Sequence, residues 1–124
     1  MKKVFFIFTL ITTMMVQTQA QTTDLQLIET TINHYFDGLV KHQPESLKKA
    51  FIPTATMKWV EEGYTEVNAL EALTGHVIAN DPVKTKASII SINVAGDAAN
   101  AQLELEYDTF SYIDFMHLLK INGE

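Results

Sequence analysis

The chain has 124 residues, no cysteine and a formal net charge of −6 at pH 7, and all nine of its basic residues are lysines. This length fits one domain that buries a core without disulfides. Nucleic acid and anionic membranes need a basic surface, and bidentate clamping of phosphate or carboxylate needs arginine. An acidic chain without arginine is therefore a poor binder of nucleic acid and of membranes.

Residues 1–20 have the pattern of a secretory signal peptide. A basic start at 1–3 precedes an apolar run at 4–16, and Thr18 and Ala20 are small residues at the positions that signal peptidase reads. The apolar run is too short to span a bilayer comfortably, which favours a cleaved leader over a membrane anchor. We expect a periplasmic or secreted protein without membrane attachment after cleavage, in a compartment where cysteines are allowed but not required.

Cleavage after Ala20 leaves one domain, residues 21–124, with seven lysines against fifteen acidic residues and thus a charge of −8. Its first segment is an amphipathic helix of about five turns that begins near Thr23. A break at 42–43 ends this helix, and a shorter helix at 44–51 starts with a proline, which is favoured at the first helical position. The apolar stripe of the first helix consists of Ile28, Ile32, Tyr35, Phe36, Leu39 and Val40.

The rest of the chain is dominated by strand patterns. Asn68 is a helix cap, and Gly96-Asp97 is a turn pair. Periodicity predicts short strands at 55–61 and 64–67, a helix at 69–78, and long strands at 84–94, 99–107 and 113–121.

The long strands differ in their apolar faces. The strand at 99–107 alternates between apolar and polar residues, as a strand with one buried face does. The strand at 113–121 is apolar on both faces, which is typical of a strand inside a sheet or against a second subunit. In the strand at 84–94, we expect one face to carry Ser88, Ile90, Ile92 and Val94. In the last strand, we expect one face to carry Phe115, His117, Leu119 and Ile121.

Three helices cannot cover both faces of such a sheet, so they are expected to cluster on one face. The predicted fold class is α+β, with a curved antiparallel sheet wrapped around the three helices into a cone that holds a pocket. Asn122-Gly123 is a strong signal for a tight hairpin turn, yet only Glu124 follows it. The expected domain therefore lacks its final strand.

Four segments resemble the nuclear transport factor 2-like (NTF2-like) superfamily and its branch described as putative lumazine-binding: 32–40 (INHYFDGLV), 51–55 (FIPTA), 91–107 (SINVAGDAANAQLELEY) and 113–123 (IDFMHLLKING). The resemblance covers residues 25–124. It implies a cone with a ligand-sized cavity, a homodimer through the convex sheet face, and SnoaL-like relatives that include polyketide cyclases, isomerases and dehydratases. It also implies a last strand of Trp-x-Ile type, which is absent here. The family often has Gly-Asp where this chain has His42-Gln43.

Five residues are candidates for the pocket walls: Tyr35, Trp59, Tyr107, Phe115 and His117. His117 lies in an apolar row and is either an acid/base group that titrates near neutral pH or a hydrogen-bonded core histidine. Tyr107 either offers a phenol to a ligand or packs as a core aromatic. Asp114 has the opposite strand parity to His117, so the two side chains do not share a face and no Asp–His dyad is expected.

Motifs for metals and cofactors are absent from the sequence. The histidines show no metal-binding spacing, and there is neither a nucleophile elbow nor a phosphate loop. We favour a domain that binds a small apolar or mixed-polarity molecule inside the cone, without a cofactor. The alternatives are a cofactor-independent isomerase, dehydratase or cyclase that uses His117 with Tyr107, and a dimerisation or assembly domain with a vestigial cavity. Two polar side chains that converge on one empty site would favour the enzyme.

Overall fold

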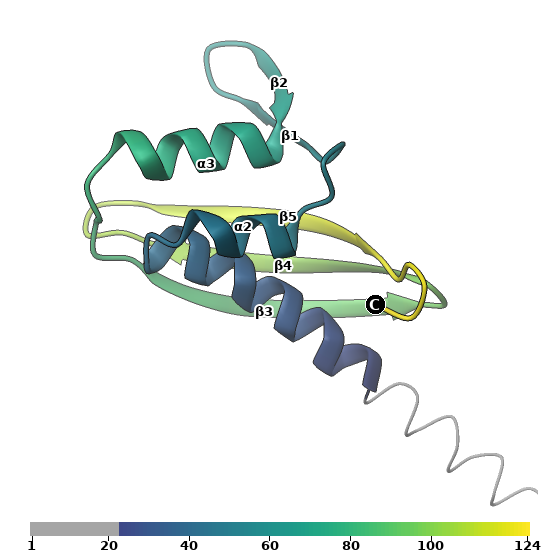
Figure 1. Cartoon of the computed structure of the whole chain (residues 1–124). Coiled ribbons are helices and arrows are strands. Elements are labelled where there is room, and N and C mark those ends of the chain that lie inside the picture. The colour runs from purple at the N-terminus through teal and green to yellow at the C-terminus, as the bar shows by residue number, and fades with distance from the viewer. Residues whose placement is uncertain (1–22) are drawn as a thin grey trace, which may run out of the picture.

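The computed structural model describes residues 23–124, and the expected signal peptide at 1–20 lies outside the described residues. Within them, no helix is long and apolar enough to cross a membrane. Helices and strands follow in the predicted order, and their described ends lie within two residues of the expected positions (Figure 1). The elements are the first helix (23–40), α2 (Pro44–Ala50), β1 (Thr56–Val60), β2 (Tyr64–Asn68), α3 (Ala69–Ala79), β3 (Lys86–Ala95), β4 (Ala98–Glu106) and β5 (Ser111–Leu119).

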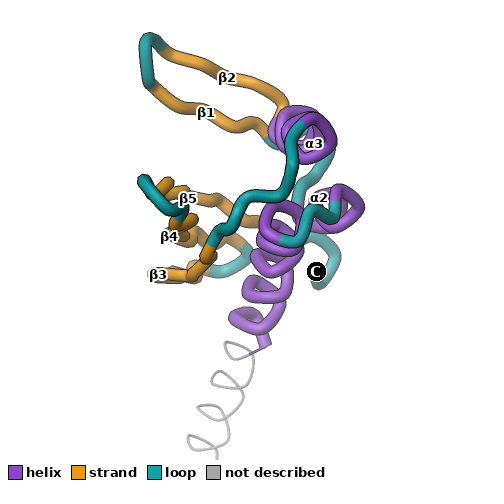
Figure 2. The backbone as a smooth tube through the Cα atoms, turned by 90° about the vertical axis from the view of Figure 1, so that its left-hand side faces the viewer, coloured by secondary structure: helices purple, strands orange, loops and turns teal. Residues whose placement is uncertain are grey.

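The fold is α+β, and the helices lie on one side of the long antiparallel sheet (Figure 2). This sheet has the order β3-β4-β5, while β1 and β2 form a separate two-stranded sheet. The central strand β4 alternates between buried and half-buried residues over 101–105, as its sequence predicts, and its inward face contacts the first helix. The core consists of Ile32, Tyr35, Leu47, Val77, Ala101, Leu103 and Leu105.

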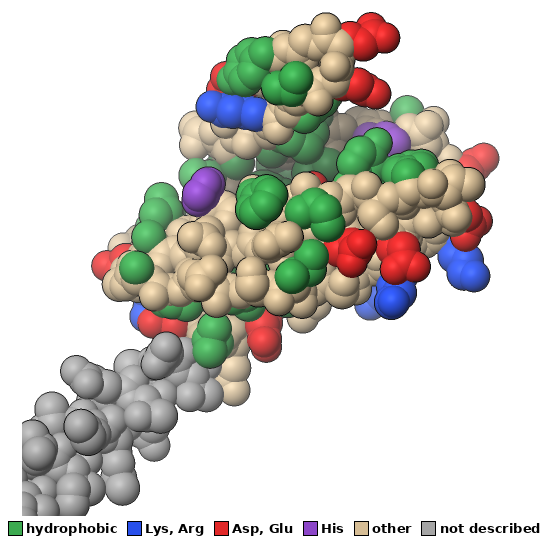
Figure 3. All heavy atoms as spheres, turned by 180° about the vertical axis from the view of Figure 1, so that it is seen from behind, with side chains coloured by type: hydrophobic (Ala, Val, Ile, Leu, Met, Phe, Trp, Pro, Cys, Tyr) green, Lys and Arg blue, Asp and Glu red, His purple; other side chains and the backbone are tan. Residues whose placement is uncertain are grey.

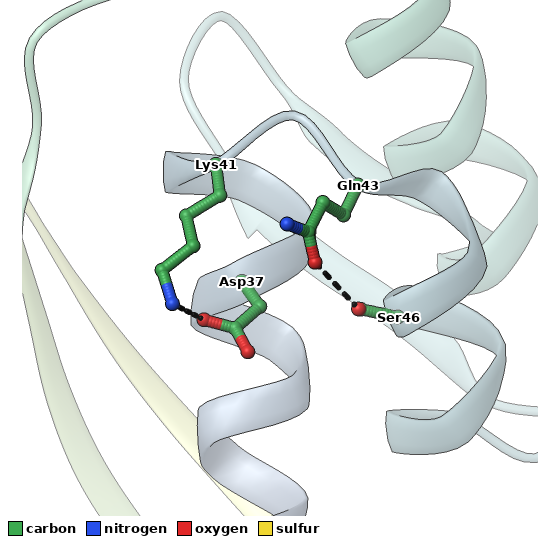
Figure 4. A network of polar contacts seen from close by, with 4 residues as sticks. All are labelled: Asp37, Lys41, Gln43 and Ser46. Carbon is green, nitrogen blue, oxygen red and sulfur yellow. Dashed lines mark hydrogen bonds and ion pairs between the residues drawn. The ribbon is translucent and has the colours of Figure 1, made fainter.

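The junction between the first helix and α2 is a tight turn at His42, whose φ of 53° lies in the left-handed region. Figure 4 shows the polar contacts on both sides of this turn. Lys41 pairs with Asp37 at 2.7 Å, and the Ser46 hydroxyl donates to Oε1 of Gln43 at 3.3 Å. A left-handed φ disfavours any residue with a Cβ atom, so glycine would fit this position with less strain than histidine.

One expected strand face is wrong because β3 contains an irregularity. Ile89 pairs with Leu103 of β4, but the next paired residue is Ser91, so the register shifts at Ile90. A bulge of this kind reverses which side chains face inward. Ile89 and Ile92 therefore pack against the core, whereas Ile90 is 48% exposed.

The predicted hairpin turn at Asn122-Gly123 is confirmed. Both residues have positive φ, 54° and 87°, as a two-residue hairpin turn requires. The N–H of Ile121 donates to the carbonyl of Glu124 at 2.7 Å, and the N–H of Glu124 donates back at 3.1 Å. Glu124 therefore lies beside Ile121, just after the end of β5.

Candidate functional site

A tyrosine and a carboxylate meet between the first helix and the inward face of β5. Tyr35 is only 4% exposed, and its hydroxyl donates a hydrogen bond of 2.6 Å to Oδ2 of Asp114. Register places Asp114 opposite the fully buried Leu103, so both side chains point toward the helices. The half-buried carboxylate is thus held on the helix-covered side of the sheet.

Burial and charge keep the Tyr35 phenol protonated. Desolvation is the main reason that the pKa of Tyr35 lies far above its usual range, and the negative charge and hydrogen bond of Asp114 raise it further. Tyr35 therefore acts as the donor and Asp114 as the acceptor. Among the described residues, the second carboxylate oxygen of Asp114, Oδ1, has no hydrogen-bond partner, so it is available to a ligand.

Three aromatic rings gather at the turn between β4 and β5, next to this pair. The rings of Tyr107 and Phe110 are stacked at 4.8 Å, and Tyr112 packs edge-on against both. The N–H of Tyr107 donates to the carbonyl of Phe110 at 2.8 Å, which closes the turn. Tyr112 lies two residues before Asp114 on the same strand face. An exposed aromatic surface therefore borders the Asp114 carboxylate.

The electrostatic environment links Tyr107 to the same cluster. Burial raises the pKa of Tyr107, hydrogen bonding with Thr85 opposes this, and the proximity of Tyr112 and Asp114 raises it further. Tyr107 therefore offers a neutral phenol near the carboxylate. Tyr107 therefore lies within electrostatic range of the Tyr35–Asp114 pair, which joins the first helix to β5.

The five residues proposed from the sequence are divided by the structure. Tyr35 and Tyr107 belong to the Asp114 cluster. Phe115 and His117 lie on the opposite face of β5, and Phe115 is 74% exposed. The expectation that they line the inside of the cone is not met, because β5 places Asp114, Met116 and Leu118 toward the helices. The predicted lack of an Asp–His dyad follows from the same parity.

Trp59 lies apart from this cluster, on the β1–β2 hairpin. A hollow of about 430 Å³ is open to solvent at the hairpin tip and is lined by Trp59, Glu61, Glu62, Gly63, Tyr64 and Thr65. Its walls come from one exposed hairpin, with Val60 78% exposed beside it. Because the lining described for this hollow comes from the hairpin alone, the Asp114 cluster is the better candidate for a binding site.

Sequence reasoning left Asp114 open between solvent, a subunit interface and the pocket, and it did not single out Phe110 or Tyr112. The sequence signal for a functional role of Asp114 is its alternation in the strand: it shares a face with Met116 and Leu118 and is the one charged residue of the three. The described residues contain no group of three histidine, aspartate or glutamate side chains arranged to hold a metal ion.

The three helices, the separate β1–β2 hairpin and the long antiparallel sheet define an NTF2-like α+β domain. The family model described as "Putative lumazine-binding" matches residues 23–124, and the chain belongs to this family. No curated protein matches the chain.

Solved structures agree with this assignment. An NTF2-like protein of unknown function from Shewanella baltica OS155 is 25% identical, with a TM-score of 0.75 over 83% of this chain and 86% of that one. Another from Methylobacillus flagellatus KT is 26% identical, with a TM-score of 0.72 over 82% and 83%. A third from Silicibacter pomeroyi DSS-3 shares the fold at 18% identity, with a TM-score of 0.71 over 83% and 88%.

Proposed function

We propose that this domain binds a small planar molecule of mixed polarity on the helix-covered side of the sheet, at Asp114. The observation that carries the proposal is the Tyr35–Asp114 hydrogen bond of 2.6 Å. It holds one carboxylate oxygen in place and leaves the other free beside exposed aromatic rings. Ligand sites commonly combine a few oriented polar groups with apolar walls in this way.

The chemistry of the cluster selects the ligand. Oδ1 of Asp114 accepts a hydrogen bond, so the ligand supplies an N–H or O–H donor. The rings of Phe110 and Tyr112 offer flat apolar surface, which favours an aromatic or heteroaromatic ring system. An anionic group at this position would be repelled by the carboxylate. Lumazine, named in the description of the family, is a planar heterocycle with ring N–H groups and is therefore the first probe.

The test is a fluorescence titration of the purified protein with lumazine and with planar heterocycles that either carry or lack a ring N–H. We expect binding of donor-bearing compounds that weakens at least tenfold in Asp114→Asn, equivalent to about 1.4 kcal/mol. Glu104→Gln is the matched control, because it removes a carboxylate from the outer face of β4. Equal affinity of the wild type and Asp114→Asn would contradict the proposal.

A second candidate function is cofactor-independent acid–base catalysis, as an isomerase, dehydratase or cyclase. It is supported by the Asp114 carboxylate, which the Tyr35 phenol holds in place and which lies within electrostatic range of the Tyr107 phenol. Asp114 then replaces His117 as the base, since His117 lies on the outer face. Solvent deuterium uptake into a bound carbon acid, lost in Asp114→Asn, would distinguish turnover from binding.

Export and self-association are further parts of this proposal. The leader pattern at 1–20 supports cleavage after Ala20, and mass spectrometry of the exported protein should then find Gln21 at the amino terminus. The exposed outer side chains Ile113, Phe115 and Leu119 support a homodimer through the outer sheet face. Sedimentation of the wild type and of Phe115→Ser tests this association. If the protein self-associates but binds no small molecule, a dimerisation or assembly function replaces the proposed ligand-binding function.

A further inference from the structure

The outer face of the long sheet, which points away from the helices, has a centre without charged side chains. Strand register aligns the outward residues of β3, β4 and β5 in rows that cross the sheet. Three adjacent rows form the neutral patch: Ala95–Ala98–Leu119, Asn93–Asn100–His117 and Ser91–Gln102–Phe115. Figure 3 looks at this face, and its acidic and basic side chains gather at the two ends and along the lower border.

The charged residues of this face begin beyond the neutral patch. The next row contains Glu104, and the row after it contains an ion pair of 3.6 Å between Lys86 and Glu106. At the other end of the sheet, Lys120 pairs with Asp24 of the first helix at 2.7 Å. Charged residues are depleted at the centres of protein interfaces, so the composition of the patch is that of an interface centre.

A second copy of the chain fits the neutral patch. The chain has a net charge of −6, so two copies repel each other where their acidic surfaces meet. An uncharged centre removes this repulsion at the point of closest approach. Two-fold symmetric interfaces bring the same surface of both subunits together, and side-chain amides suit this symmetry because they both donate and accept hydrogen bonds. The exposed rings and methyl groups of Phe115 and Leu119 add apolar area.

His117 is the titratable residue of the neutral patch. Its exposed side chain lies between Phe115 and Leu119 along β5 and opposite Asn100 of β4, and its diagonal neighbours on β4 are uncharged as well. The nearest carboxylates on this face belong to Glu104, two rows away, and to a residue in the β3–β4 turn, Asp97. Among residues 23–124 no helix covers this face (Figure 2). The groups that meet His117 in a dimer are therefore those of a second neutral patch.

The hydrogen bond within the middle row favours a neutral imidazole. Nδ2 of Asn93 donates to Oδ1 of Asn100 at 3.2 Å, which leaves the amide nitrogen of Asn100, a donor, for another partner. A neutral imidazole has one nitrogen that accepts such a bond, whereas an imidazolium only donates. Burial of an imidazolium among uncharged side chains also has a desolvation cost. Association through the patch therefore opposes protonation of His117.

We propose that protonation of His117 controls self-association: two copies associate through the neutral patch near neutral pH and separate in mildly acidic solution. This inference rests on the self-association proposed above. Histidine side chains change their charge between about pH 8 and pH 5. Because the dimer binds fewer protons than two free copies, its stability is fully present at the upper end of this range and decreases as the pH falls through it.

The test is sedimentation equilibrium of the purified protein at pH 7.5 and pH 5.5. We expect the dimer dissociation constant to rise at least tenfold at pH 5.5, and to rise much less in His117→Gln, which stays neutral. His76→Gln is the matched control, because His76 is also exposed but lies on α3, and it should respond like the wild type. His117→Lys carries a charge at both pH values and should associate weakly at both.

The direction of the change separates His117 from the general effect of acid. Protonation of other side chains lowers the net negative charge of each copy, which would strengthen association. Equal dissociation constants of the wild type at both pH values, or the same rise in His117→Gln, would overturn the role of His117 and leave self-association in place. A protein that is monomeric at both pH values would overturn self-association and this inference together, whereas ligand binding at Asp114 is tested independently by the titration above.

Discussion

Tyr35 and Asp114 are 79 positions apart in the chain, and their side chains share a hydrogen bond of 2.6 Å between the first helix and the edge strand β5. This contact connects the core to the candidate ligand site. It is also a long-range side-chain hydrogen bond that ties β5 to the first helix, as the bond from Lys120 to Asp24 does just after the strand. The stability of the domain and the position of the Asp114 carboxylate are therefore coupled.

Removal of the Tyr35 hydroxyl should destabilise the protein. Tyr35→Phe leaves the half-buried Asp114 carboxylate without its donor, which should lower the free energy of unfolding by about 1–2 kcal/mol. The measurement is urea denaturation. Tyr64→Phe is the matched control, because Tyr64 also bonds to a carboxylate, Glu66, but on the exposed hairpin. Similar losses in both variants would show that the buried setting of Tyr35 has no special effect.

Stability should fall in alkaline solution because of Tyr35. Its pKa in the folded protein lies above the ordinary value of 10.0, so above pH 10 the unfolded chain binds fewer protons than the folded one. The contribution is fully present below pH 10 and decreases as the pH rises from there toward the folded pKa. Urea denaturation at pH 9 and pH 11 should show a larger loss for the wild type than for Tyr35→Phe. Equal losses would contradict a raised pKa.

Gly38 should not tolerate a side chain, although it lies in a helix. A Cβ atom there would collide with the Leu47 side chain of α2, so Gly38→Ala should cost about 1–3 kcal/mol through overpacking. Gly75 of α3 is the matched control, because a Cβ atom there meets nothing within 4 Å. Gly75→Ala should raise the free energy of unfolding by up to about 1 kcal/mol. Thermal unfolding of both variants measures this difference in sign.

Glycine at position 42 should stabilise the protein. His42 has a φ of 53°, and a left-handed conformation costs a residue with a Cβ atom about 1–2 kcal/mol. His42→Gly should therefore raise the melting temperature. Glu29→Gly, at an exposed position inside the first helix, should lower stability by about 0.5 kcal/mol. A loss of stability in His42→Gly would show that the imidazole makes a compensating contact.

Elements with strong local signals were predictable from the sequence. The apolar stripe of the first helix, Pro44 at the start of α2, the Asn68 cap and the Asn122-Gly123 turn each depend on residues close in sequence. Local propensity and periodicity therefore placed these elements within two residues. The alternation of β4 also predicted the buried side chains Leu103 and Leu105, because one uninterrupted strand keeps one parity.

The inward face of β5 depended on tertiary structure. Apolar residues occupy both faces of this strand. The period of the sequence therefore did not show whether the face of Asp114 or the face of His117 points toward the helices. The first helix packs on one side of the sheet, and the pairing of Leu103 with Asp114 directs the carboxylate toward Tyr35. The bulge at Ile90 likewise reverses the parity of β3 without a glycine or proline to mark it.

By itself, the sequence determined the α+β class, the order of the elements, the family and the tight turn after β5, because these follow from residues that are neighbours in the chain. Only the tertiary structure decided that the Tyr35 hydroxyl bonds to Asp114 near Tyr107, and that Phe115 and His117 lie on the other face of β5. These relationships join residues that are distant in sequence, and their geometry is set by how the helices pack against one face of the sheet.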